Sequence, residues 1–107
     1  MKERSPITTH ILDMAKGKPA AGVPVTLDIL DGKNWKTLGQ GMTNADGRVE
    51  DLLPKSAPLA TGIYRLTFET KSFYPQVAIQ FQVTSETEHY HIPLLLSPYG
   101  YSTYRGS

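Results

Sequence analysis

The chain has 107 residues, a formal net charge of +1 at pH 7 and no cysteine. A chain of this length predicts one small domain, residues 1–107, that buries only about two-thirds of its unfolded surface, so oligomerisation would add stability. The near-neutral charge gives no reason to expect a nucleic-acid or membrane partner, and the lack of cysteine excludes disulfides and thiolate zinc sites.

The N-terminal residues MKERSPITTH carry charges but no apolar segment, so we expect no secretory signal. No apolar run approaches the ~20 residues of a membrane span. The terminal Arg-Gly-Ser differs from the Ser-Lys-Leu type of peroxisomal address. The sequence therefore predicts a cytoplasmic protein.

Short strands separated by turns follow along the chain. Residues 23–29 alternate between apolar and polar side chains, as in a half-buried strand. Asp31-Gly32 marks a turn, after which residues 35–43 can return antiparallel, and Asp46-Gly47 marks a second tight turn. Residues 52–62 contain two prolines, Ser, Thr and Gly, which predicts a loop. Residues 63–70 then alternate again.

The second half of the chain continues this pattern. Residues 77–83 alternate, and the preceding residues 71–76 have room for at most one short helical turn because Pro75 interrupts it. Two final strands, 89–96 and 101–105, are joined by a turn at 97–100. Seven or eight strands at this spacing predict an all-β sandwich.

Strand alternation gives residues 89–96 one core face and one mixed face. The core face is a continuous apolar stripe of Tyr90, Ile92, Leu94 and Leu96. The mixed face carries His89, His91, Pro93 and Leu95. A plain solvent-facing strand seldom carries both a proline and a leucine, so the mixed face indicates an interface.

The first and last strands carry similar mixed faces. The first strand places His10 with Leu12, and the last places Ser102 with Tyr104. Three strands can therefore supply a polar and apolar surface, although alternation alone does not show that these faces converge.

Three segments, SPITTHILD near the start, NADGR at 44–48 and the terminal YRGS, together resemble the 5-hydroxyisourate hydrolases of the transthyretin-like family. The resemblance covers nearly the whole chain. It implies a transthyretin-like (prealbumin-like) β-sandwich that hydrolyses 5-hydroxyisourate without a metal or other cofactor. It also implies a homotetramer, a dimer of dimers, with the sites in a channel at the dimer–dimer interface.

The resemblance also implies which residues form the site. The implied catalytic residues are His10, Arg48, His91 and Tyr104. The implied substrate contacts add Leu12, Pro93, Leu95, Ser102, Arg105 and Ser107. In transthyretin itself, lysine replaces His10, an acidic residue replaces Arg48, and threonine replaces His91 and Tyr104. His89 is expected at the rim of the site or behind it.

Three alternatives stay open at this stage. His89-x-His91 with His10 could supply three imidazoles to a zinc ion, but no cluster of Asp or Glu accompanies them. A transthyretin-type carrier of a small aromatic ligand would use the same channel. A structural adhesion domain is a third reading, and it leaves the histidine-bearing faces unexplained.

Overall fold

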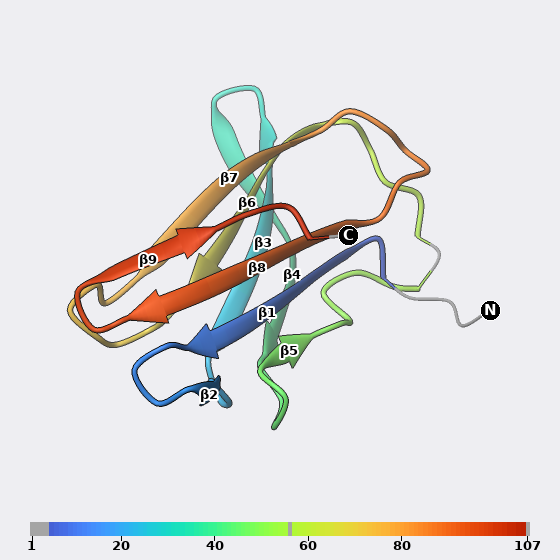
Figure 1. The fold of residues 1–107 in the computed structure, drawn as a ribbon. Helices are drawn as coiled ribbons and strands as arrows, with labels where there is room; N and C mark the ends of the chain where they lie inside the picture. The colour runs from blue at the N-terminus through green and yellow to red at the C-terminus, as the bar shows by residue number, and fades with distance from the viewer. Residues whose placement is uncertain (1–4, 56, 107) are drawn as a thin grey trace.

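Nine β-strands in two sheets make up the fold of the computed structural model, which describes residues 5–55 and 57–106 (Figure 1). The strands are β1 (Ile7–Asp13), β2 (Lys18–Pro19), β3 (Pro24–Asp31), β4 (Asn34–Met42), β5 (Arg48–Val49), β6 (Gly62–Phe68), β7 (Val77–Val83), β8 (Tyr90–Ser97) and β9 (Gly100–Thr103). The all-β sandwich predicted from the sequence is confirmed. The seven longer strands match the predicted segments, whereas the two-residue strands β2 and β5 were not predicted.

One sheet has the order β4-β3-β6-β7 and is antiparallel throughout. The other has the order β2-β1-β8-β9, and here β1 and β8 run parallel. The edge of β1 that faces away from β8 pairs with two short strands in succession. Strand β5 pairs with it at Thr9 and His10, and β2 pairs with it at Leu12 and Asp13. Strand β1 therefore lies inside the second sheet, with β8 on one side and β5 and β2 on the other.

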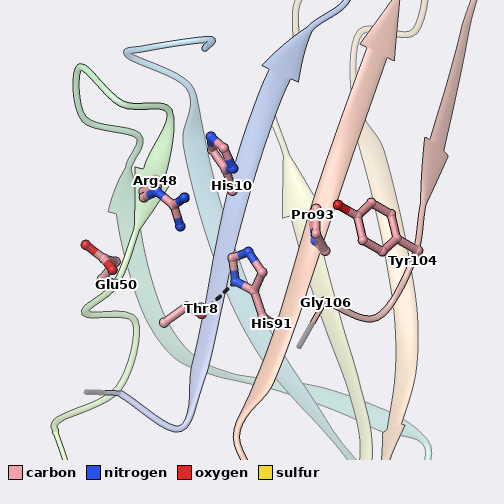
Figure 2. A pocket seen from close by; sticks show the side chains of 8 residues that line it. All are labelled: Thr8, His10, Arg48, Glu50, His91, Pro93, Tyr104 and Gly106. Atoms are coloured by element: carbon pink, nitrogen blue, oxygen red, sulfur yellow. Dashed lines mark hydrogen bonds between the residues drawn. The ribbon is translucent and has the colours of Figure 1, made fainter. Parts of the chain in front are cut away.

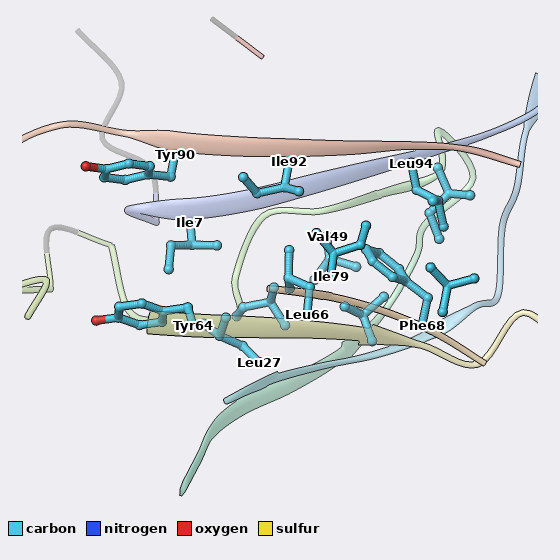
Figure 3. Packing of buried hydrophobic residues seen from close by; sticks show 14 of the residues in the cluster. Ile7, Leu27, Val49, Tyr64, Leu66, Phe68, Ile79, Tyr90, Ile92 and Leu94 are labelled. Atoms are coloured by element: carbon cyan, nitrogen blue, oxygen red, sulfur yellow. The ribbon is translucent and has the colours of Figure 1, made fainter. Parts of the chain in front are cut away.

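The core lies between the two sheets, as Figure 3 shows. Strand β6 contributes Tyr64, Leu66 and Phe68, and β8 contributes Tyr90 and Ile92, all buried as their alternation predicts. Each apolar side chain buried in this way contributes roughly 1.5–3 kcal/mol relative to an exposed one. This packing turns the opposite face of β8 outward, together with the mixed faces of β1 and β9.

The segment between β6 and β7 bends rather than forming a helical turn, with Lys71 at a φ of +52°. The main-chain N–H of Lys71 donates to the carbonyl of Pro75 at 3.1 Å and closes this bend. In the part of the chain that the structure describes, no helix is long and apolar enough to cross a membrane.

Candidate functional site

An open pocket of about 340 Å³ lies on the outward face of the sheet that contains β1 and β8 (Figure 2). Its lining residues are Thr8, His10, Arg48, Glu50, His91, Pro93, Tyr104 and Gly106. They come from β1, from β5 and the residue after it, from β8 and from the C-terminal tail. The pocket thus brings together His10, Arg48, His91 and Tyr104, the four residues expected to be catalytic.

Strand register explains why these side chains meet. His10 pairs with Arg48 on one side and with Pro93 on the other, so the three form one row across the sheet. Thr8 pairs with His91, which forms a bridge with Gly106, and this second row lies two residues along β1. Side chains two residues apart on a strand share a face, so both rows open into the same pocket.

A tight turn aims Arg48 at this pocket. The side-chain oxygen of Asn44 accepts hydrogen bonds from the main-chain N–H groups of Asp46 at 2.9 Å and Arg48 at 3.1 Å. Gly47 has a φ of +73°, and a Cβ at this position would lie 2.5 Å from the carbonyl oxygen of Ile11. That carbonyl belongs to β1, so only glycine lets the turn approach the strand closely enough for Arg48 to pair with His10.

His10 is half-buried beside the Arg48 guanidinium. Burial lowers the pKa of His10 below its ordinary value of 6.5, the positive charge of Arg48 lowers it further, and the backbone and carboxylate of Asp46 act in the opposite direction. At neutral pH the His10 imidazole is therefore mostly uncharged. One of its ring nitrogens can then accept a proton while the other donates a hydrogen bond, and the tautomer decides which nitrogen has which role.

His91 is fixed in the second row by Thr8. The Oγ1 of Thr8 lies 2.8 Å from Nδ1 of His91 and 2.9 Å from Nε2 of His89. Figure 2 shows the His91 ring with one edge toward Thr8 and the other edge toward His10. The nitrogen that remains, Nε2, therefore faces the pocket.

The C-terminal tail closes one side of the site. Leu94 pairs with Thr103 and His91 pairs with Gly106, so the tail follows β8 in one antiparallel register beyond the end of β9. Tyr104, in this register, lies opposite Pro93, and its side chain is 57% exposed. A Cβ on Gly106 would lie 2.6 Å from Cδ2 of His91, so the tail packs directly against that imidazole.

The remaining expected substrate contacts lie outside this pocket lining. Leu12, Leu95 and Ser102 form a third row on the same face, two residues further along β1. Arg105 points to the other side of the tail, where its guanidinium donates to Oε1 of Glu88 at 3.0 Å and packs over the Tyr90 ring. Ser107 lies outside the described residues.

Three lining residues were missed by the sequence analysis: Thr8, Glu50 and Gly106. Thr8 shares a strand face with His10, and that alternation could have identified it. Glu50 follows Arg48 by two residues, but a two-residue strand carries no periodic signal. Among the described residues, no group of three or more His, Cys, Asp or Glu side chains is placed to hold a metal ion.

Comparison with known proteins gives a consistent result. The family model for the HIUase/Transthyretin family matches residues 7–106. A 5-hydroxyisourate hydrolase of Mus musculus is 45% identical over 116 residues, which cover 98% of this chain and 98% of that protein.

Two solved structures resemble the fold. The structure of Klebsiella pneumoniae 5-hydroxyisourate hydrolase matches with a TM-score of 0.81 and 40% identity, covering 94% of this chain and 97% of that one. Sea bream transthyretin in complex with thyroxine matches with a TM-score of 0.87 and 29% identity, covering 95% of each chain. Backbone shape is therefore shared by both proteins, whereas sequence identity is higher to the hydrolase.

Proposed function

The chain belongs to the HIUase/Transthyretin family, and on that premise we propose that it hydrolyses 5-hydroxyisourate, the unstable product of urate oxidation. Water adds to the lactam carbonyl of the six-membered ring, and the carbon–nitrogen bond then breaks. The freed nitrogen takes up a proton, giving 2-oxo-4-hydroxy-4-carboxy-5-ureidoimidazoline. The reaction needs an activated water, stabilisation of oxyanion charge and a grip on a flat polar ring.

The single observation that carries this proposal is the convergence of two imidazoles, one guanidinium and one phenol in one pocket. These groups come from positions 10, 48, 91 and 104. Each group can supply one of the three requirements, and the resemblance implies that the carrier branch of the family has other residue types at all four positions.

Water activation falls to the two histidines. A neutral imidazole can accept a proton from water near pH 7, and general-base help of this kind is worth about 10²–10⁴-fold in rate. We assign the base to His91, whose Nε2 faces the pocket, and we assign substrate orientation or onward proton transfer to His10. The lowered pKa of His10 keeps it uncharged beside Arg48.

Arg48 and Tyr104 hold the substrate. The planar guanidinium can bind an acidic heterocycle through two parallel hydrogen bonds and stabilise the negative charge that develops as water adds. Tyr104 can stack on the flat ring or donate its hydroxyl to a ring oxygen. The exposed position of its side chain on the pocket rim supports contact with a bound molecule.

The assembly forms part of the proposal. We place the chain in a cytoplasmic homotetramer, a dimer of dimers, whose interface covers the pocket. The openness of the outward face of the sheet supports this, because Tyr104 leaves 57% of its surface exposed. Substrate contacts from Leu12, Leu95 and Ser102 are proposed on the same face, which an interface would enclose.

The test is the decay of freshly prepared 5-hydroxyisourate, followed by ultraviolet absorbance with and without the protein. Decay must exceed the spontaneous rate, and His10→Ala, Arg48→Ala and His91→Ala must each lower the catalysed rate at least ~10-fold. Sedimentation must show that these variants assemble as the parent does. A parent rate equal to the background refutes the proposal.

The second candidate is a transthyretin-type carrier, favoured by the TM-score of 0.87 to the thyroxine-bound protein. A carrier would bind a small aromatic ligand in the pocket but leave the decay of 5-hydroxyisourate at its background rate. The same assay, together with calorimetric titration of thyroxine, separates the two functions.

A further inference from the structure

The described part of the C-terminal tail, residues 104–106, lies beside β8 but is joined to it by an interrupted ladder. The pairing of β8 with β9 ends at Thr103, and the next bridge joins Gly106 to His91. In this register Pro93 lies opposite Tyr104, and a proline has no main-chain N–H to donate to a neighbouring strand. Side-chain contacts are therefore needed to hold the tail against β8 between the two paired positions.

Arg105 supplies side-chain contacts within this interval. Its guanidinium donates from Nη2 to Oε1 of Glu88 at 3.0 Å and to the main-chain carbonyl of His89 at 3.2 Å. The central carbon of the guanidinium, Cζ, lies 4.4 Å from the ring centroid of Tyr90. The three partners are consecutive residues at the start of β8 and just before it. One side chain of the tail therefore makes three contacts with a short segment of the neighbouring strand.

Tyr90 offers the guanidinium a fixed surface. The residue is buried, and its hydroxyl accepts hydrogen bonds from the main-chain N–H groups of Thr84 at 3.2 Å and Ser85 at 3.1 Å. These contacts fix the ring at both of its ends. A cation over the face of an aromatic ring is attracted by the negative charge of that face. The contact with Tyr90 thus joins Arg105, and the tail, to the edge of the core.

The place of Arg105 in the tail connects these contacts to the pocket. Arg105 lies between Tyr104 and Gly106, which both line the pocket, and its own side chain extends to the opposite side of the tail. We propose that Glu88 and Tyr90 are positioning residues that act through Arg105. They hold the tail, and with it Tyr104 and Gly106, against the pocket. The inference rests on the proposed function, in which the tail closes one side of the site.

The contacts of Arg105 differ in their response to salt. The side chains of Arg105 and Glu88 are each 52% exposed, so dissolved ions screen the attraction between them. The contact with Tyr90 involves a buried ring, and buried or partly buried interactions are screened much less. High salt should therefore remove the contribution of Glu88 to tail docking and leave most of the contribution of Tyr90.

Hydrogen exchange of the Gly106 amide measures tail docking without any substrate. This N–H donates to the carbonyl of His91 at 2.8 Å, so it exchanges with solvent when the tail leaves β8. Arg105→Ala should speed the exchange at least ~10-fold, because an exposed ion pair and a cation–π contact are lost together. Glu88→Gln should speed it about 2- to 5-fold at low ionic strength. In ~1 M salt, where the screening length is ~3 Å, this variant should match the parent.

Glu86→Gln is the matched control for Glu88→Gln. It removes the same charge from an exposed position on the loop between β7 and β8, and the exchange rate should stay at the parent value. In the Arg105→Ala background, Glu88→Gln should have no further effect, because the partner of Glu88 is already absent. Equal effects of the two Gln variants, a Glu88→Gln effect that persists without Arg105, or an unchanged rate in Arg105→Ala each overturn the proposal.

Kinetics connect tail docking with the reaction. For 5-hydroxyisourate, kcat/KM should fall at least ~10-fold in Arg105→Ala, since positioning errors of about 1 Å can cost 10²-fold. Arg105→Lys tests the Tyr90 contact, because it keeps the charge but not the flat guanidinium, and its kcat/KM should lie between those of Arg105→Ala and the parent. Added salt should lower the activity of the parent more steeply than that of Glu88→Gln.

Two kinetic results would contradict the proposal: parent-like kcat/KM in Arg105→Ala, or identical salt dependence of the parent and Glu88→Gln. Failure of the proposed function is distinguishable from both. In that case the parent itself would not accelerate the decay of 5-hydroxyisourate, while exchange of the Gly106 amide would still rank the variants by tail docking.

Discussion

In the proposed function, Arg48 acts on the substrate through its shape as well as its charge. Its planar guanidinium offers five N–H donors in a fixed geometry, whereas a lysine ammonium is a point charge on a flexible stem. The turn at Asn44 and Gly47 fixes the main chain of Arg48, from which the side chain extends into the pocket. The position of the Arg48 side chain is therefore determined by main-chain contacts of the turn that comes just before it.

Arg48→Lys should lower kcat/KM by about 10²–10³-fold, the usual worth of one correctly placed oxyanion donor. Positive charge is retained, but the two parallel hydrogen bonds are lost. Arg48→Gln, which lacks the charge as well, provides the comparison and should be at least as impaired. Steady-state hydrolysis of 5-hydroxyisourate measures both variants, and an unimpaired Arg48→Lys would show that charge alone suffices.

His10 provides a prediction about acid stability. Its pKa in the folded protein lies below the ordinary 6.5 because of burial and the Arg48 charge, so the unfolded chain binds this proton more tightly. The contribution of His10 is fully present above pH ~6.5 and is lost as pH falls through the folded pKa. His10→Gln should therefore lose less stability than the parent on acidification, measured by urea unfolding across this range. An equal loss in both proteins would contradict the prediction.

At the scale of elements, the alternation of β6, β7 and β8 predicted their buried faces because one-sided burial imposes a period of two. It could not predict that β1 pairs parallel with β8, since Thr8 and His91 lie 83 positions apart. Nor could alternation predict β5, because a strand of two residues has no period to detect and forms through its pairing with β1. The resemblance named five of the eight lining residues, His10, Arg48, His91, Pro93 and Tyr104, and the strand register explains how they meet.

The C-terminal tail makes a sharper test possible, because Gly106 of the tail and Gly100 at the start of β9 differ in their surroundings. A Cβ on Gly106 would lie 2.6 Å from the His91 ring, whereas a Cβ on Gly100 would have nothing within 4 Å. Gly106→Ala should displace the tail or the imidazole and lower activity at least ~10-fold, since positioning errors of about 1 Å can cost 10²-fold. Gly100→Ala should leave activity unchanged. Similar activities of the two variants would refute this role of the tail.

At the scale of the whole molecule, the outward face of the β1–β8 sheet combines a polar pocket with the apolar row of Leu12 and Leu95. Such a face suits an interface that also shields a reaction from bulk water. The proposed tetramer would place this face inside the assembly. Fold and site would then depend on one another, because association would complete the enclosure of the pocket.

Dilution should test this dependence. If the tetramer encloses the site, specific activity should fall at concentrations where sedimentation shows dissociation, and both should recover together on reconcentration. An active monomer with undiminished kcat/KM would show that the pocket of one chain suffices. Removing residues 104–107 should abolish most activity at every concentration, because Tyr104 and the contacts of Gly106 with His91 are lost.

The position of β1 between β8 on one edge and β5 and β2 on the other has a kinetic consequence. Loop-closure entropy makes pairings between distant segments slow to form, and sandwiches dominated by such pairings typically refold in milliseconds to seconds. The proposed catalytic groups meet only after the first strand has been inserted beside a strand synthesised near the end of translation. Enzymatic turnover would therefore report complete folding of the polypeptide, and it should reappear no earlier than the slowest spectroscopic phase of renaturation.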